Sequence, residues 1–175
     1  VTHYGGLVHY RNLGDGTFQD ATSSAGFGQI NSFLLGLTAG DYDMDGDLDL
    51  YLCGYVEFDR QRARNRPIVA GRPAVWTNHV SYQALPNILL QNNGGKFTDV
   101  TESADVANAA GKSMQAIFCD FNNDGWLDLF VGAYEAQLEH FMRDARGEPH
   151  GARIPNLYRN NGDCLLYTFP SPRTQ

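Results

Sequence analysis

The chain has 175 residues and a formal net charge of −7, from 13 Lys and Arg against 20 Asp and Glu. This acidic balance argues against a general nucleic-acid-binding protein, which needs a basic surface, and no apolar run approaches the ~20 residues of a membrane-spanning helix. With 42% hydrophobic residues the chain can bury a core, and its 19 Gly and 9 Tyr favour strands and turns over a helical bundle.

In chain order, the first expected element is a β-hairpin within residues 7–20, which we interpret as the end of a preceding unit. Short apolar runs then predict four strands of a first full unit, at roughly 34–39, 48–53, 87–91 and 96–100. A second unit is expected to contribute strands at roughly 113–118, 127–132 and 156–160, with its fourth strand missing or corrupted.

The two units are copies of each other. With a shift of 79 residues, twelve positions between 18 and 55 carry the same residue in both copies. Triplets that end in Asn12, Asn92 and Asn160 also recur, each before a Gly-rich turn. Four strands per repeat predict an all-β fold, a partial β-propeller of about two and a half four-stranded antiparallel blades. A sandwich of irregular meanders is the alternative.

The repeat divides the chain into four parts. Residues 1–32 are expected to form the end of a preceding blade and a connection, 33–111 a blade with a long insertion, and 112–163 a second, incomplete blade. Residues 164–175 resemble translated sequencing-adapter sequence and are left out of the expected fold. That tail contains Cys164. The other two thiols, Cys53 and Cys119, are expected to lie unpaired on strands.

The most specific motif lies between the first and second strands of each copy. Oxygen-bearing side chains stand at positions 1, 3, 5 and 9 of a nine-residue loop, with Gly at position 6, where a sharp turn needs positive φ. Position 7 would offer its backbone carbonyl. The candidate metal ligands are Asp41, Asp43, Asp45, Asp47 (carbonyl) and Asp49, and then Asp120, Asn122, Asp124, Trp126 (carbonyl) and Asp128.

An all-oxygen loop of this kind predicts two Ca²⁺ sites, because Ca²⁺ takes 6–8 oxygen ligands in flexible geometry. The absence of cysteine and histidine from both loops argues against zinc. An EF-hand is excluded, since position 12 is Leu52 or Val131 instead of Glu and the flanks read as strands. An acidic, solvated turn without a metal is the alternative.

These residues resemble the FG-GAP/VCBS-type calcium-binding propeller repeats found in the heads of integrin α-subunits. The run at 12–22 most resembles the ASPIC/UnbV and cartilage-acidic-protein-like branch, and the resemblance extends over residues 7–163. It implies a seven-bladed propeller that binds calcium in the loops between first and second strands. It also implies a role in binding or adhesion outside the cell, in the periplasm or at the cell surface.

Strand parity places the metal loops and the Gly-rich hairpins at one face of the blades, and the insertions at 55–86 and 134–155 at the other. The insertions hold eight of the 13 basic residues. We predict that they bind a protein or an anionic polysaccharide. The alternative is that their arginines pair with nearby acids and order the loops. The candidate contact residues are Arg60, Arg62, Arg64, Arg66, Arg72, Trp76 and Tyr82.

No motif of a catalytic site is present: neither Gly-x-Ser-x-Gly, nor His-Glu-x-x-His, nor a phosphate-binding Gly loop occurs. The sequence therefore predicts a non-enzymatic, calcium-binding module in which Ca²⁺ is structural. A calcium-dependent polysaccharide lyase or hydrolase on a propeller scaffold is the alternative. No signal peptide is recognisable at Val1, so an extracellular location is expected from the resemblance alone.

Overall fold

The computed structural model describes residues 1–59, 61, 68–69, 72–73, 82–109, 111–134, 146, 156–163 and 165–169. Within these residues the protein consists mainly of β-strands, with a short 3-10 helix, η1 (Phe27–Gln29). No helix in this part of the chain has the length and apolar character needed to cross a membrane.

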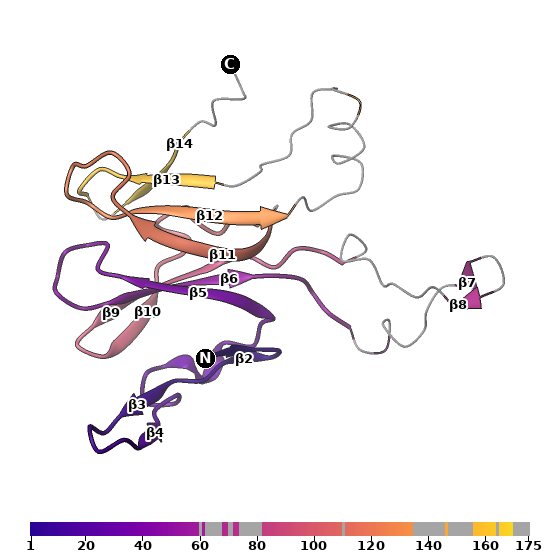
Figure 1. Cartoon of the computed structure of the whole chain (residues 1–175), viewed down its shortest axis with the longest axis horizontal. Coiled ribbons are helices and arrows are strands. Elements are labelled where there is room, and N and C mark those ends of the chain that lie inside the picture. The colour runs from indigo at the N-terminus through magenta and orange to yellow at the C-terminus, as the bar shows by residue number, and fades with distance from the viewer. Residues whose placement is uncertain are drawn as a thin grey trace.

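Two four-stranded antiparallel sheets form the body of the structure (Figure 1). The first runs in the order β5 (Leu34–Gly40), β6 (Asp49–Gly54), β9 (Ile88–Asn93) and β10 (Lys96–Asp99). The second runs in the order β11 (Lys112–Cys119), β12 (Asp128–Tyr134), β13 (Asn156–Asn160) and β14 (Leu166–Phe169). Each sheet is therefore a simple meander, as expected for a propeller blade.

Short hairpins complete the described strands. In the N-terminal segment β1 (Thr2–His3) pairs with β2 (Gly6–Leu7), and β3 (Tyr10–Asn12) pairs with β4 (Phe18–Asp20). The hairpin expected within 7–20 is thus present, whereas β1 and β2 have no counterpart among the predicted elements. A third pair, β7 (Ile68–Val69) and β8 (Arg72–Pro73), lies in the first insertion.

The two blades have equivalent strand registers. Ala39 pairs with Leu50 in the first blade, and the residues 79 positions later, Phe118 and Leu129, pair in the second. The seven strands predicted from the sequence are all present, with ends within two residues of the prediction. The all-β, four-stranded blade architecture is confirmed, and the irregular sandwich is not what the chain forms.

The second blade is more complete than the sequence predicts. Its fourth strand is β14, in which Leu166 pairs with Asn160 and Tyr167 with Arg159. The sequence predicts a fourth strand that is missing or corrupted; the structure has a paired strand there, within the residues left out of the expected fold. An edge strand needs only backbone hydrogen bonds and one apolar anchor, and the buried Leu166 supplies the anchor. That residues 164–175 are foreign to the protein stays a prediction.

The blades stack face to face, with β5 and β6 of the first lying against β11 of the second (Figure 1). Alternate residues of β6 point to opposite faces of the sheet, so Tyr51 and Cys53 face the second blade. Leu52 faces the N-terminal segment instead, where it packs with Phe27 and Leu7. The first blade is therefore buried on both faces, which explains the nearly continuous apolar sequence of β6.

The innermost strands approach closely because glycine stands where a side chain would not fit. A Cβ atom on Gly36 of β5 would lie 2.4 Å from the carbonyl oxygen of Met114 in β11. The ring of Phe118 likewise covers Gly40, and it stacks on Tyr42 at 6.4 Å between centroids. These contacts join the ends of β5 and β11. The two candidate metal loops, which follow these strands, therefore begin close to each other on neighbouring blades.

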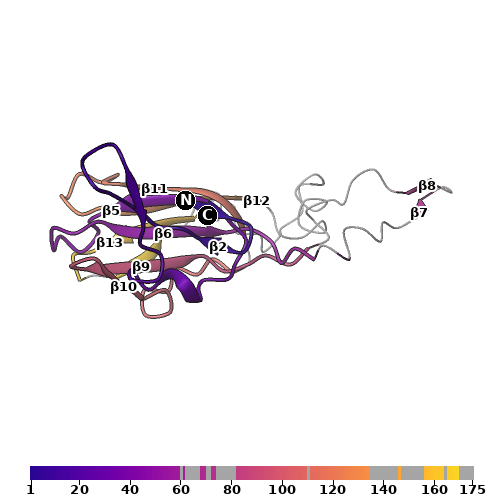
Figure 2. The same cartoon turned by 90° about the horizontal axis from the view of Figure 1, so that it is seen from below.

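The connections between strands lie at two opposite ends of the sheets. The β5–β6 and β11–β12 loops and the β9–β10 hairpin lie together at one end of the strands (Figures 1 and 2). Because β6 and β12 run the opposite way, the chain leaves both strands at the other end and enters the insertions there. This confirms the two-ended arrangement expected from strand parity.

A polar network lies inside the core between the blades. The hydroxyl of Tyr51 donates to the carbonyl oxygen of Val106 (2.7 Å) and accepts from Nδ2 of Asn87 (2.7 Å). Oδ1 of Asn87 in turn accepts from the backbone N–H of Gly54 (2.9 Å). All these side chains are buried, and burial raises the pKa of the neighbouring Cys53 thiol to about 12. Cys53 and Cys119 are both free thiols on strands, as predicted.

We expect Tyr51→Phe to destabilise the protein by about 1–3 kcal/mol, because it leaves Val106 O and Asn87 Nδ2 buried without a partner. Urea unfolding followed by circular dichroism measures this difference. Tyr10→Phe, at a position 51% exposed, is the control and should change little. Equal losses for the two variants would show that the network does not stabilise the core.

Candidate metal centre

The two predicted loops, 41–49 and 120–128, occupy equivalent places in the two blades. Each leaves the first strand of its blade and ends on the aspartate that begins the second strand, Asp49 in β6 and Asp128 in β12. Both loops consist of bends, without regular structure, at the end of the stacked sheets where the hairpins also lie (Figure 1).

Hydrogen bonds from the backbone turn the carboxylates of the first loop inward. The two oxygens of Asp41 accept from the N–H groups of Asp45 and Gly46, both at 3.1 Å. Oδ1 of Asp45 accepts from the N–H of Asp47 (2.8 Å). The second loop repeats these bonds. Asp120 accepts from Asp124 N–H (3.1 Å) and Gly125 N–H (2.9 Å), and Asp124 accepts from Trp126 N–H (3.0 Å).

Left-handed backbone at two positions closes each loop. Gly46 and Gly125, at position 6, have φ of 95° and 91°, as the sequence predicts. Position 4 is also left-handed, with φ of 60° at both Met44 and Asn123. This second turn was not predicted: Met44 gives no signal for a conformation that costs a non-Gly residue roughly 1 kcal/mol. The available signal was Asn123, because Asn is enriched in left-handed backbone.

Three carboxylates of the first loop converge on one point. Asp41, Asp43 and Asp49 each present an oxygen, and these oxygens all lie within 4.8 Å of one another. The side chain of Asp47 turns away from them and accepts from the N–H of Gly94 in the β9–β10 hairpin (2.7 Å). Position 7 therefore has only its carbonyl to offer a metal, as the sequence analysis expects.

The carboxylate at position 9 is buried and joins three parts of the blade. Oδ2 of Asp49 accepts from the N–H of Tyr42 in the loop (3.1 Å), and Oδ1 from the N–H of Asn92 in β9 (2.8 Å). Asp49 has no exposed surface, and burial raises its pKa to about 6. The hydrogen bonds from the two N–H groups lower the pKa, but by less than burial raises it. The charges of Asp43 and Asp45 raise it further.

Asp128 repeats this arrangement in the second blade. Its carboxylate is fully buried and accepts from the N–H groups of Phe121 (3.0 Å) and Asn160 (2.8 Å). Two distant segments of each blade, the metal loop and the third strand, thus meet at one carboxylate. Position 9 is the ligand position that the fold fixes most firmly, because its side chain has no freedom to turn outward.

The recurring asparagine of the triplets supports the same corner. Asn92 Nδ2 donates to the carbonyl of Leu48 (3.1 Å), and Asn160 Nδ2 donates to that of Leu127 (3.2 Å), at position 8 of each loop. Asn160 Nδ2 also reaches the carbonyl of Tyr42 in the other blade (2.7 Å). From the sequence, this asparagine predicts only a turn, because its hydrogen-bond partners lie 44 and 33 residues away.

The second loop differs from the first in its side chains. Position 3 is Asn122, whose Nδ2 donates to Asp124 Oδ2 (2.7 Å). Arg159 of β13 reaches the same Asp124 oxygen at 3.5 Å. The N–H of Trp126, the Asn122 amide and the Arg159 guanidinium hold the pKa of Asp124 below its usual value. In the first loop the residue equivalent to Arg159 is Gln91, whose Nε2 donates to Asp43 Oδ2 (2.5 Å).

Most of the predicted partner-binding residues lie outside the described part of the chain: Arg60, Arg62, Arg64, Arg66 and Trp76. Arg72 lies on β8, where the backbone alone is described. Tyr82 is 6% exposed and packs on Phe58, with 5.6 Å between ring centroids. Its side chain is thus placed for packing within the protein and not for contact with a partner.

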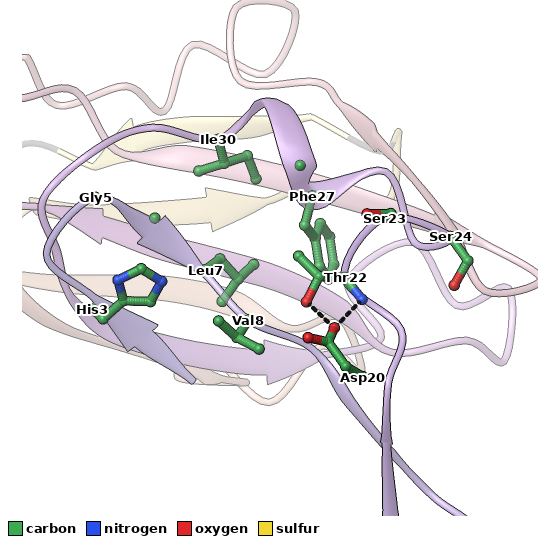
Figure 3. A pocket seen from close by; sticks show the side chains of 12 residues that line it. His3, Gly5, Leu7, Val8, Asp20, Thr22, Ser23, Ser24, Phe27 and Ile30 are labelled. Atoms are coloured by element: carbon green, nitrogen blue, oxygen red, sulfur yellow. Dashed lines mark hydrogen bonds between the residues drawn. The ribbon is translucent and has the colours of Figure 1, made fainter.

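A hollow of about 640 Å³ lies on the N-terminal segment, away from the metal loops. Figure 3 shows Asp20 within it, accepting from the N–H and hydroxyl of Thr22 (2.9 and 2.6 Å). His3 and Ser24 lie at opposite ends of this hollow (Figure 3). Its one described carboxylate is therefore already satisfied, and the histidine is not placed to activate that serine.

Comparison with known proteins agrees with this architecture. The FG-GAP-like repeat family model matches residues 1–52 and 73–131, which include both metal loops. Cartilage acidic protein 1 of Homo sapiens is 22% identical over 163 residues, which cover 74% of this chain and 25% of that relative. The chain thus spans about a quarter of the relative's length. Because this family model matches more than half of the chain, the chain belongs to the FG-GAP-like repeat family.

Proposed function

We propose that this protein is a calcium-binding module of an extracellular or surface-exposed binding protein, with one Ca²⁺ in each of the loops 41–49 and 120–128. The observation that carries the proposal is the convergence of Asp41, Asp43 and Asp49 within 4.8 Å on a loop scaffold that the second blade repeats. Membership of the FG-GAP-like repeat family supports the same reading.

The donor set fits a hard dication. Carboxylate oxygens of Asp41, Asp43 and Asp49 are the ligands Ca²⁺ prefers, with Asp45 and the carbonyl at Asp47 available to extend the shell. Asp120, Asn122, Asp124, Asp128 and the Trp126 carbonyl would serve in the second loop. Neither loop contains a cysteine or a histidine, the usual ligands of zinc.

The role of the ion in this proposal is structural. Asp41 and Asp43 follow β5 while Asp49 begins β6, so a dication held by all three joins the first two strands of the blade. Two of these carboxylates are also hydrogen-bonded to β9, because the N–H of Asn92 donates to Asp49 and the amide of Gln91 donates to Asp43. Bound Ca²⁺ supplies positive charge among like charges that otherwise repel, and the chain's own residues provide the rigid frame.

A structural calcium ion also bears on location. A ligand that binds only the folded state stabilises it by RT ln(1 + [L]/Kd), so weak sites of this kind contribute most where calcium is millimolar. This supports an extracellular, periplasmic or cell-surface setting. The ring of seven blades, the division of the chain at 32, 111 and 163, and a binding or adhesion role for the whole protein stay predictions in this proposal.

We expect two Ca²⁺ to bind per chain and to raise the melting temperature. Asp41→Ser and Asp120→Ser, at position 1 of each loop, should each abolish one site, which calorimetric titration of the chelated protein measures. Asp15→Ser is the control, because that carboxylate caps Thr17 in the first hairpin (2.6 and 2.9 Å) and lies outside both loops. No calcium-dependent heat from a protein with a β-sheet spectrum would refute the metal sites.

The titration of Asp49 should depend on calcium. Without metal, its raised pKa means that the folded state holds a proton between about pH 4 and 6 that the unfolded chain has lost. The free energy of unfolding contributed by this group therefore falls as the pH rises through that window. Bound Ca²⁺ favours the carboxylate and should move the carboxyl ¹³C titration of Asp49 below pH 4, whereas Asp20 should titrate unchanged. A pKa of Asp49 that calcium leaves at 6 would contradict its role as a ligand.

The insertions are the proposed contact surface for an anionic partner. Exchange of Arg60, Arg62, Arg64 and Arg66 for Ser should lower the salt concentration that elutes the protein from an immobilised sulfated polysaccharide. Arg11→Ser combined with Lys96→Ser, outside the insertions, should leave the elution unchanged. Equal elution of all three proteins would mean that the four arginines serve to order the insertion.

A further inference from the structure

The two metal loops differ in charge although their backbones match. Loop 41–49 contains five aspartates, and loop 120–128 contains three, with Asn122 in place of the acid at position 3. The left-handed residues, the capping N–H groups and the buried position 9 carboxylate are nevertheless the same in both. A difference in ion binding must therefore come from side chains and not from loop geometry.

One strand position reaches into each loop from outside it. The residue before the recurring asparagine is Gln91 in β9 and Arg159 in β13. Gln91 donates a neutral amide hydrogen bond to Asp43, whereas Arg159 brings a full positive charge to Oδ2 of Asp124 at 3.5 Å. The same place on the blade is thus occupied by a neutral donor beside the first loop and by a cation beside the second.

We propose that Arg159 is a tethered cation that competes with Ca²⁺ at the second loop. The two sites are then unequal: the first depends on an external dication, and the second is partly neutralised by the chain itself and binds Ca²⁺ more weakly. This inference rests on the proposed calcium function. Because the guanidinium is tethered to β13, a positive charge stays near Asp124 at every calcium concentration.

The exposure of the pair makes the competition moderate. The side chains of Arg159 and Asp124 are 45% and 30% exposed, so solvent screens their attraction and the arginine can swing aside when the ion binds. Interactions of this strength correspond to changes in affinity of roughly two- to fivefold. Arg159 therefore lowers the affinity of the second site without closing it.

Exchange of the two strand residues tests the inference. Calcium is titrated into the chelated protein while NMR follows the amides of Gly46 and Gly125, which donate to position 1 of each loop and report the sites separately. In the unmodified protein Gly46 should respond at lower calcium than Gly125. Arg159→Gln should lower the midpoint at Gly125 roughly two- to fivefold and leave Gly46 unchanged, and Gln91→Arg should raise the midpoint at Gly46.

Two controls separate charge from shape. Arg159→Lys keeps the cation and should retain the weak second site, and Arg11→Gln, at the equivalent place in the first hairpin, should shift neither midpoint. If both amides respond with equal midpoints that the exchanges do not move, the tethered cation is refuted while the calcium function stands. If neither amide responds to calcium in a folded protein, the calcium function fails and this inference fails with it.

Discussion

A buried carboxylate at the start of the second strand is the interaction on which each blade depends. Asp49 and Asp128 have no exposed surface, and each accepts one N–H from its own loop and one from the third strand. These bonds fix the entry of the loop, the beginning of the strand and the position of its neighbour at a single point. A charge in that place is costly to bury, which is why its surroundings supply donors and, in our proposal, a cation.

The stacking of the blades follows from the two apolar faces of the first sheet. Tyr51 and Cys53 pack against the second blade, and Leu52 packs against the N-terminal segment. The glycines of β5 let the innermost strands approach, and Asn160 adds a hydrogen bond from the second blade to Tyr42 in the first metal loop. The two loops are therefore held in a common frame.

Within this frame the repeat has kept the scaffold of the loop and varied its charge. The backbone turns at Gly46 and Gly125 are the same, while Asp43 is replaced by Asn122 and Gln91 by Arg159 in the second copy. In our proposal, the two equivalent loops therefore bind Ca²⁺ with different affinities. The insertions leave at the opposite end of the strands, so ion binding and partner binding in our proposal use separate ends of the blades.

The sequence by itself determined the strands, the four-stranded repeat and the spacing of the loop oxygens, because each of these depends on residues close together in the chain. Strand periodicity and a glycine at position 6 act locally, and the 79-residue shift duplicates them. Only the tertiary structure decided that Asp49 is buried against Asn92, that Arg159 reaches Asp124, and that β14 completes the second blade. The first two contacts join residues 43 and 35 positions apart, and they depend on strand order, which local patterns do not specify. β14 pairs with the strand just before it, but its sequence lacks the Gly-x-Phe pattern of the other two hairpins, so local pattern gave no signal for it.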